Sequence, residues 1–234
     1  MPLPSSASTR SPLHGDRRDH VVQAVIARVI SGDLAGGDRL VTQDLVNELN
    51  VSATPVREAL AVLAGLGVVD LLPNRGAVIH QFTRREIRDI SRVRRALECE
   101  AIRGACGRIP PSQLRHLEAE FERLSQSPIK GQRGINKART LDTQLHDAIR
   151  QNCANAFLIR ELERLGHLFR SFRDASWNDA SSRNDSDRLA EEAAEHLLIV
   201  QSLRRKDSKA AVRHLSRHIA ASSRYWSRVV EQGG

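Results

Sequence analysis

Two polar residues, Asp142 and His146, lie four positions apart in the stretch LDTQLHDAI, inside an expected amphipathic helix. They fall on the same helical stripe as the apolar residues around them, which are Leu141, Leu145 and Ile149. Burying a carboxylate or an imidazole without a partner costs free energy. These two side chains therefore need either a hydrogen bond to each other or a shared ligand.

Two histidines further along the chain have the same character. His196 lies on an apolar stripe in the segment RLAEEAAEHLLIVQSL, and His218 lies on one in AAVRHLSRHIAASS. Three imidazoles and one carboxylate on facing helices suit a divalent transition metal such as Zn²⁺, Ni²⁺, Mn²⁺ or Fe²⁺. A single inward histidine is usually a satisfied core residue, whereas the four residues together favour a metal site formed by Asp142, His146, His196 and His218.

The elements that must position these residues are helical. Six amphipathic segments follow residue 83, separated by polar or Pro- and Gly-bearing breaks, at residues 84–107, 111–127, 134–151, 155–177, 187–205 and 208–231. None of them shows the alternating pattern of a strand. We therefore expect an all-α bundle of six helices at residues 83–232.

The first third of the chain has a different pattern. Residues 1–19 are rich in Pro, Ser and Arg, and this composition predicts a disordered tail. Residues 20–82 show three helical segments, the last of them SATPVREALAVLAGLG, and then two β-like stretches, VVDLL and AVIHQF, on either side of PNRG. Three helices followed by a hairpin predict a winged helix-turn-helix domain, so the expected fold class is mainly α.

Charge and composition restrict the classes of function. The chain of 234 residues has a net charge of +8, but its first 82 residues hold seven Lys and Arg against eight Asp and Glu. DNA binding must therefore rest on particular side chains rather than on total charge. Three cysteines without C-x-x-C spacing argue against a disulfide framework and a cysteine zinc site. Without a long apolar run or a signal peptide, we expect a cytoplasmic protein with no membrane partner.

The N-terminal motifs carry a family resemblance. The runs ISGDLAGGDRL, LNVSATPVREALAVLAGLGVV and NRGAVI resemble the DNA-binding domain of GntR-type bacterial transcription regulators, in which VS-x-TPVREAL is a specific motif. The resemblance implies that Ser52, Thr54 and Arg57 contact double-stranded DNA at the start of the recognition helix. It also implies that Arg75 and Gly76 form the tip of a wing beside the minor groove.

The chain departs from that family at Ala53, where arginine is common. A methyl group makes no bidentate contact with guanine, so the operator sequence of relatives cannot be transferred to this chain. An alternative interpretation of Arg57 and Glu58 is a solvated helix face, which is the usual place for charges on an amphipathic helix. The motif favours DNA binding.

The candidate metal ligands carry a second resemblance. The pattern D-x-x-x-H, then EH, then A-x-x-x-L-x-x-H is similar to that of the FCD effector-binding domain, which follows the winged helix in the FadR subfamily. In many members the matching residues bind a metal at the floor of the effector cavity. The resemblance implies that Asp142, His146, His196 and His218 are the ligands of a divalent metal, with Zn²⁺ first and Ni²⁺, Mn²⁺ or Fe²⁺ as alternatives. A domain of six helices looks like the VanR-type subgroup.

The start of the second domain adds a candidate for effector binding. ISRVRRALE resembles a family motif that matches Arg94, Leu97 and Glu98. The resemblance implies that Arg94 faces the cavity, where a guanidinium can bind a carboxylate through two hydrogen bonds. The alternative is that Arg92, Arg94 and Arg95 form a solvated face near the DNA.

These expectations combine into one function. We expect a DNA-binding transcription regulator, a repressor in its mode of action, that binds a palindromic operator as a homodimer and responds to a small organic acid. One alternative is a metal-dependent hydrolase, which lacks an evident second carboxylate as general base and leaves the DNA-binding motif unexplained. A second alternative is a regulator in which the metal is structural or is itself the signal.

Overall fold

The computed structural model describes residues 14–31, 33–73, 75–126, 131–182 and 186–232, with some side chains of these ranges left out. The chain folds into two compact units. Residues 1–29 and 34–81 form the first, and residues 30–33 and 82–234 form the second.

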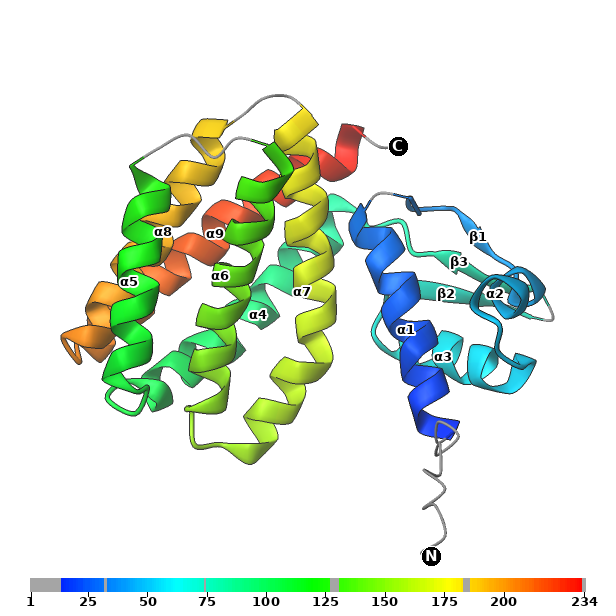
Figure 1. Ribbon diagram of the computed structural model, residues 1–234, viewed down its shortest axis with the longest axis horizontal. Helices are drawn as coiled ribbons and strands as arrows, with labels where there is room; N and C mark the ends of the chain where they lie inside the picture. Colours follow the sequence, from blue (N-terminus) through cyan, green and yellow to red (C-terminus); the bar gives the residue numbers. More distant parts are fainter. Residues whose placement is uncertain (1–13, 32, 74, 127–130, 183–185, 233–234) are drawn as a thin grey trace, which may run out of the picture. The chain divides into compact units, whose positions relative to one another are not determined.

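The first unit combines helices with a small sheet (Figure 1). Its elements are α1 (His14–Ser31), β1 (Arg39–Leu40), α2 (Thr42–Leu49), α3 (Ala53–Gly65), β2 (Val69–Leu72) and β3 (Gly76–Ile79). The strands are antiparallel in the order β1-β3-β2, so the expected hairpin of β2 and β3 is extended by β1. A strand of two residues is too short to give an alternating pattern, and for this reason the sequence did not predict β1.

The first helix starts earlier than the composition suggested. Residues 14–19, assigned above to a disordered tail, belong to α1. The negative charge of Asp16 in its first turn interacts favourably with the positive end of the helix dipole and so stabilises the helix start. The rest of that predicted tail, residues 1–13, lies outside the described residues. The buried face of α1 packs into the core of the unit through Val21, Val22, Val25 and Ile26.

The turn between α2 and α3 follows from local chemistry. Asn50 ends α2 in the left-handed conformation at φ 51°, which asparagine adopts more readily than most residues. Ser52 is the N-cap residue of α3 in extended conformation, although its side chain makes no capping hydrogen bond. The short turn fixes the direction in which α3 leaves α2, and it leaves Ser52 and Thr54 exposed at the start of α3.

The second unit is a helical bundle, and the mainly α fold class is confirmed. Its helices are α4 (Arg84–Ala105), α5 (Pro111–Ser125), α6 (Gly131–Gln151), α7 (Ala156–Ser182), α8 (Ser186–Arg204) and α9 (Ser208–Gln232). Within this unit α4 packs along α9, and α5 packs along α8 (Figure 1). No helix in the described part of the chain is long and apolar enough to cross a membrane.

The bundle contains a large apolar core and a set of buried polar side chains. A capping box between Thr83 and Glu86 starts α4, which packs against α9, α6 and α7. The large apolar cluster draws on all six helices and includes Ile102, Phe121, Leu145, Leu158, Leu203 and Leu215. Polar side chains buried beside this cluster come from α4, α6, α7, α8 and α9, and they form the site described next.

Candidate metal centre and DNA-contact surface

The start of α3 presents a polar, exposed face. Ser52, Thr54 and Arg57 are exposed, whereas Ala53 is half-buried. The opposite face of α3 is buried through Pro55, Val56, Ala59, Leu60 and Leu63. Because the apolar face fixes the helix in its unit, two hydroxyls and a guanidinium are directed to solvent, where they are available to phosphates and base edges.

The tip of the hairpin has a structural requirement for glycine. Gly76 has φ +87°, and a Cβ atom there would lie 2.1 Å from the carbonyl oxygen of Leu40. Any side chain would therefore disrupt the pairing of β1 with β3. Arg75 beside it is exposed. The geometry explains Gly76 without DNA, while Arg75 keeps its side chain available for a partner.

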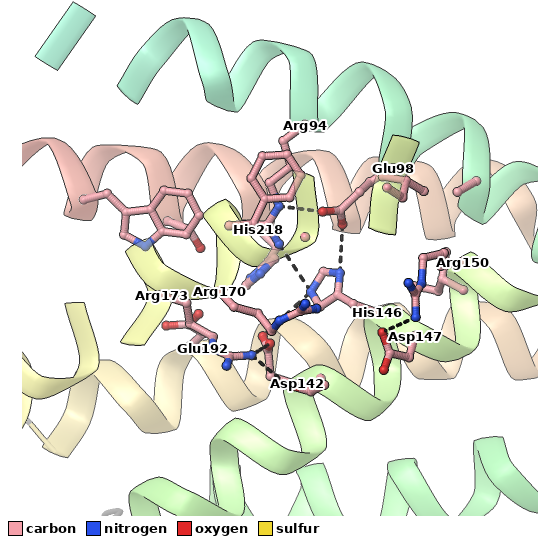
Figure 2. Close-up of a pocket in the computed structure, with 18 residues that line it drawn as sticks. Arg94, Glu98, Asp142, His146, Asp147, Arg150, Arg170, Arg173, Glu192 and His218 are labelled. Carbon is pink, nitrogen blue, oxygen red and sulfur yellow. Dashed lines mark hydrogen bonds and ion pairs between the residues drawn. The ribbon is translucent and has the colours of Figure 1, made fainter. Parts of the chain in front are cut away.

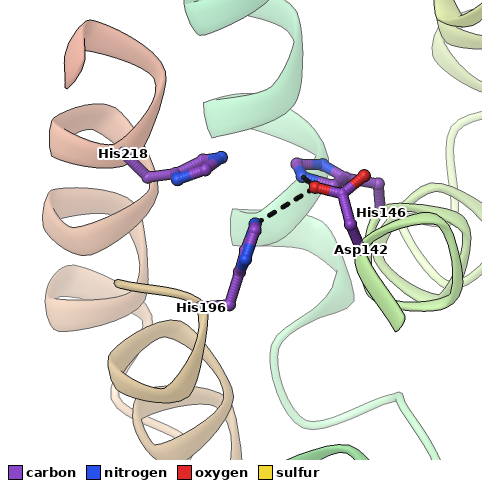
Figure 3. A group of neighbouring side chains, drawn as sticks. All are labelled: Asp142, His146, His196 and His218. Atoms are coloured by element: carbon purple, nitrogen blue, oxygen red, sulfur yellow. Dashed lines mark ion pairs between the residues drawn. The ribbon is translucent and has the colours of Figure 1, made fainter. Parts of the chain in front are cut away.

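The four predicted metal ligands converge in the second unit (Figure 3). Asp142 and His146 come from α6, His196 from α8 and His218 from α9, and one donor atom of each lies within 4.8 Å of all the others. Asp142 Oδ1 is 3.3 Å from His196 Nε2 and 3.7 Å from His146 Nε2. Neighbouring ligands bound to one zinc ion at about 2.0–2.2 Å lie at comparable separations, so small side-chain movements would complete a coordination shell.

The burial of His196 tests whether these residues fit a metal. Its Nε2 atom is buried and has no hydrogen-bond partner among the described residues, because the geometry toward Asp142 is not that of a hydrogen bond. A buried ring nitrogen without a partner is costly, and a metal ion would satisfy it. The donor set of three imidazoles and one carboxylate therefore fits a divalent transition metal.

Charged residues behind the four donors hold them in place. His146 Nδ1 lies 2.8 Å from Glu98 Oε2, and His218 Nδ1 hydrogen-bonds Glu195 Oε2 at 2.9 Å. In both histidines the contact is made by Nδ1, so Nε2 is the ring nitrogen that remains for a metal. Arg173 on α7 donates to Asp142 Oδ2, so Oδ1 remains directed at the histidines. Such outer partners orient metal ligands and fix the ring tautomer.

Arg94 lies at the edge of the cluster, in the cavity rather than on a solvated face. Its guanidinium is buried and donates to Glu98 Oε1 at 2.6 Å, and its Nη2 lies 3.4 Å from His146 Nε2. The rings of Phe169 and Trp226 each lie 5.3 Å from its Cζ atom. Aromatic faces and a carboxylate together keep the charge in the interior.

The electrostatics of the cluster follow from these contacts. Burial raises the pKa of Glu98, but the charges of Arg94 and His146 outweigh it and lower this pKa to about 2. Burial also opposes ionisation of Asp142, yet Arg173 and His146 hold its pKa well below the usual value. Both carboxylates are therefore ionised at neutral pH.

His146 and His218 differ in their surroundings. Burial lowers the pKa of His146, but Glu98 and Asp142 outweigh it and raise the pKa above the usual value. Burial, His196 and Arg94 lower the pKa of His218 well below the usual value, which leaves a neutral imidazole. His218 is thus prepared to bind a metal, whereas His146 must first release a proton.

The cluster opens onto a cavity of about 50 Å³ (Figure 2). Four arginines line it, which are Arg94, Arg150, Arg170 and Arg173, and so do four carboxylates, which are Glu98, Asp142, Asp147 and Glu192. Arginine and carboxylate charges are therefore balanced around the cavity. A divalent cation bound by neutral histidines would shift that balance toward positive charge and so attract an anion.

Sequence reasoning left several of these residues without a role. Glu98 was part of a matched motif, and Glu195 stands next to a predicted ligand, but only the fold shows that they contact His146 and His218. Arg173 carries no motif at all, because it reaches Asp142 from a separate helix. For one of these contacts the sequence did offer a signal, because the i, i+4 spacing of Arg94 and Glu98 is typical of an ion pair on a helix.

Comparison with protein families agrees with both units. Residues 17–79 match the family of bacterial regulatory proteins described as the gntR family, and residues 89–221 match the FCD domain. Together these matches cover most of the described chain. The families and the named relatives are transcription regulators and not enzymes.

Individual relatives match different lengths of the chain. The HTH-type transcriptional regulator McbR of Escherichia coli K12 is 34% identical over 100 residues, which span 43% of this chain and 45% of McbR. The HTH-type transcriptional repressor RspR of the same organism is 28% identical over 204 residues, 85% of this chain and 86% of RspR. The solved structure of E. coli McbR/YncC superposes with a TM-score of 0.74 at 22% identity, covering 91% of this chain and 97% of that one.

Proposed function

Because the chain belongs to the GntR family of bacterial transcription regulators and carries an FCD domain, we propose that it is a repressor whose DNA binding responds to a small organic acid. In this proposal Asp142, His146, His196 and His218 hold a divalent transition metal, with Zn²⁺ first and Ni²⁺, Mn²⁺ or Fe²⁺ as alternatives. The metal, when bound, supplies a Lewis-acidic centre for an anionic ligand.

The observation that carries this proposal is the charge balance of the cavity. Four arginine charges face four carboxylates there, and the donor set for a divalent cation opens into the same space. The Cζ atom of Arg94 lies 5.3 Å from each of two aromatic rings, and its Nη2 atom lies 3.4 Å from a candidate metal ligand, His146. A carboxylate ligand in this position would accept hydrogen bonds from Arg94. Its negative charge would offset the positive charge that a bound metal adds to the cavity.

The first unit supplies the DNA contacts in this proposal. Ser52, Thr54 and Arg57 would lie against the major groove from the exposed face of α3, and Arg75 with Gly76 would lie at the minor groove from the hairpin tip. Ala53 offers a methyl group where relatives offer a bidentate donor. We therefore expect an operator sequence that differs from those of arginine-bearing relatives.

A two-fold dimer on a palindromic operator completes the proposal. A homodimer presents two copies of α3, and each would contact one half-site of the DNA. The organic acid would act by binding one arrangement of the dimer more tightly than another. The chromosomal operator makes the cytoplasm the place of action.

The test begins with protein purified without chelators. Its metal content is measured by plasma mass spectrometry, and its affinity for a duplex selected from a random pool is measured by gel shift with and without a panel of small carboxylic acids. We expect one divalent metal per chain and an acid that changes DNA affinity. Arg94→Lys keeps the charge but loses the planar double contact, and it should weaken that response.

A second candidate function has its own supporting observation. The cavity of about 50 Å³ holds little more than one or two water molecules, so an organic acid can enter only if side chains move. This favours a regulator in which the metal is structural or is the signal. In that case metal alone would change DNA affinity, and no acid in the panel would have an effect.

A further inference from the structure

One buried polar group of the metal cavity takes no part in the ion pairs around it. Ser222 on α9 lines the cavity and is 2% exposed, and its Oγ atom has no hydrogen-bond partner among the described residues. A hydroxyl that is buried without a partner costs free energy, which an alanine in its place would avoid. The position therefore points to a polar ligand that the hydroxyl contacts inside the cavity.

Other serines of the bundle satisfy their hydroxyls on their own helix. Ser202 on α8 is also buried, and its Oγ donates to the carbonyl oxygen of Leu198 at 2.8 Å. Ser227 on α9 donates to the carbonyl oxygen of Ser223 at the same distance. A bond to the carbonyl four residues back is a common arrangement for a helical serine. Ser222 does not make it, so its hydroxyl is left for a group outside the helix backbone.

The position of Ser222 lies between the two groups that an organic acid would contact. His218, Ser222 and Trp226 follow one another at intervals of four residues on α9, so they share one face, and all three line the cavity. His218 is a candidate metal ligand, and the ring of Trp226 lies 5.3 Å from the Cζ atom of Arg94. Four residues span about 6 Å of a helix. An acid held by the metal and by Arg94 would therefore lie within reach of the Ser222 hydroxyl.

The chemistry of a serine hydroxyl defines the second polar group of that acid. The hydroxyl is uncharged and can both donate and accept, so a neutral hydroxyl group matches it in either direction of the hydrogen bond. Charged partners for a carboxylate are already supplied by the arginines of the cavity. The small volume of about 50 Å³ favours an acid with few carbon atoms.

We propose that Ser222 hydrogen-bonds a hydroxyl group of the effector, so that the effector is a small hydroxycarboxylic acid. Ser222 takes this role only if the chain responds to an organic acid, as proposed above, and it then determines which class of acid is bound. A site built around a ligand hydroxyl rejects the analogue that lacks it, because the polar group of the site then stays buried and unpaired.

Matched pairs of acids are the probes. Lactate differs from propionate by one hydroxyl group, and malate differs from succinate in the same way. Their binding to the full-length chain, purified without chelators, is measured by isothermal titration calorimetry at constant pH and ionic strength. We expect the hydroxy acid of at least one pair to bind at least about tenfold more tightly than its partner. Ser222→Ala should reduce this preference to less than about twofold and leave binding of the plain acid unchanged.

Ser202→Ala is the matched control, because it removes a buried hydroxyl of the same bundle outside the cavity. It should keep the native preference. A preference that persists in Ser222→Ala, or that falls equally in Ser202→Ala, would overturn the role of Ser222 and leave the proposed function intact. The same holds if none of the four acids binds while another acid changes DNA affinity. If no acid has any effect, the proposed response to an organic acid fails as well.

The free energy of unfolding separates ligand binding from a structural role. Ser222→Ala removes an unpaired hydroxyl, so the ligand-free chain should keep or gain stability to urea. Ser202→Ala removes a hydroxyl that has a partner, and this variant should lose stability. An equal loss in both variants would mean that Ser222 Oγ is bonded within the fold, which would overturn its role in ligand binding.

Discussion

The two candidate sites of this chain solve opposite physical problems. On α3 and the hairpin, the polar side chains are exposed, and each is positioned by the apolar residues behind it. In the bundle, Asp142, His196 and Arg94 are buried, and each depends on other charged residues for its position. The first site can lose one residue and keep its structure. The second is a network in which one removed group leaves another uncompensated.

The difference also concerns where the free energy of binding comes from. Exposed hydroxyls and guanidinium groups exchange water for phosphate and base contacts at modest cost. The buried site has already replaced water by ion pairs, such as Arg94 with Glu98 and Arg173 with Asp142. A metal bound there would act on preorganised donors, so we expect metal binding and the stability of the unit to be coupled.

The largest expected effect is the loss of one buried ligand. His196→Ala should weaken binding of Zn²⁺ by at least about a hundredfold, because one of four ligands carries roughly a quarter of a large binding free energy. Competition with a chromophoric chelator measures the affinity. His116→Ala, at an exposed position on α5, is the control and should bind as the native chain does. Native affinity in the His196 variant would remove this residue from the site.

The next effect concerns acid stability. The pKa of Glu98 is lowered from 4.5 to about 2, so its ionised form stabilises the fold above pH 4.5, and this contribution is lost as the pH falls toward 2. The shift corresponds to roughly 3 kcal/mol. Urea unfolding of the metal-free chain should show that the free energy of unfolding decreases as the pH falls through this range. In Glu98→Gln this decrease should be smaller. An unchanged pH profile in Glu98→Gln would contradict the assignment.

A smaller effect is expected at the exposed site. Arg57→Ala should reduce affinity for the selected duplex by roughly ten- to hundredfold, as for the loss of one base or phosphate contact, while Zn²⁺ affinity stays native. Gel shifts at fixed salt measure the first quantity and chelator competition the second. Arg115→Ala is exposed on α5 and controls for net charge. If both variants bind DNA equally, Arg57 makes no specific contact.

The smallest effect sharpens the contrast between surface and interior. Arg28 and Glu48 form an ion pair of 2.8 Å in the first unit, with half of the Glu48 side chain exposed. Water screens such a pair, so Glu48→Ala should change the free energy of unfolding by less than about 1 kcal/mol. Glu98→Ala, which leaves Arg94 buried without its partner, should cost several times more by the same urea measurement. Equal costs would mean that burial does not separate the two pairs.

The sequence by itself determined the class of the protein and much of its fold. Helical periodicity gave the bundle helices, the Gly- and Pro-bearing breaks gave their ends, and VS-x-TPVREAL gave the DNA-binding unit, because these signals are local. Asp142, His146, His196 and His218 were chosen as polar residues on apolar stripes, and they do converge. Their role as metal ligands stays a prediction.

Only the tertiary structure decided the surroundings of those residues. The pairing of Arg173 with Asp142 joins positions 31 residues apart, and that of His146 with Glu98 joins separate helices. The strand β1 likewise arises from packing. A periodic pattern states which side chains face inward, but it does not state which of them meet. That depends on how the helices pack around one core.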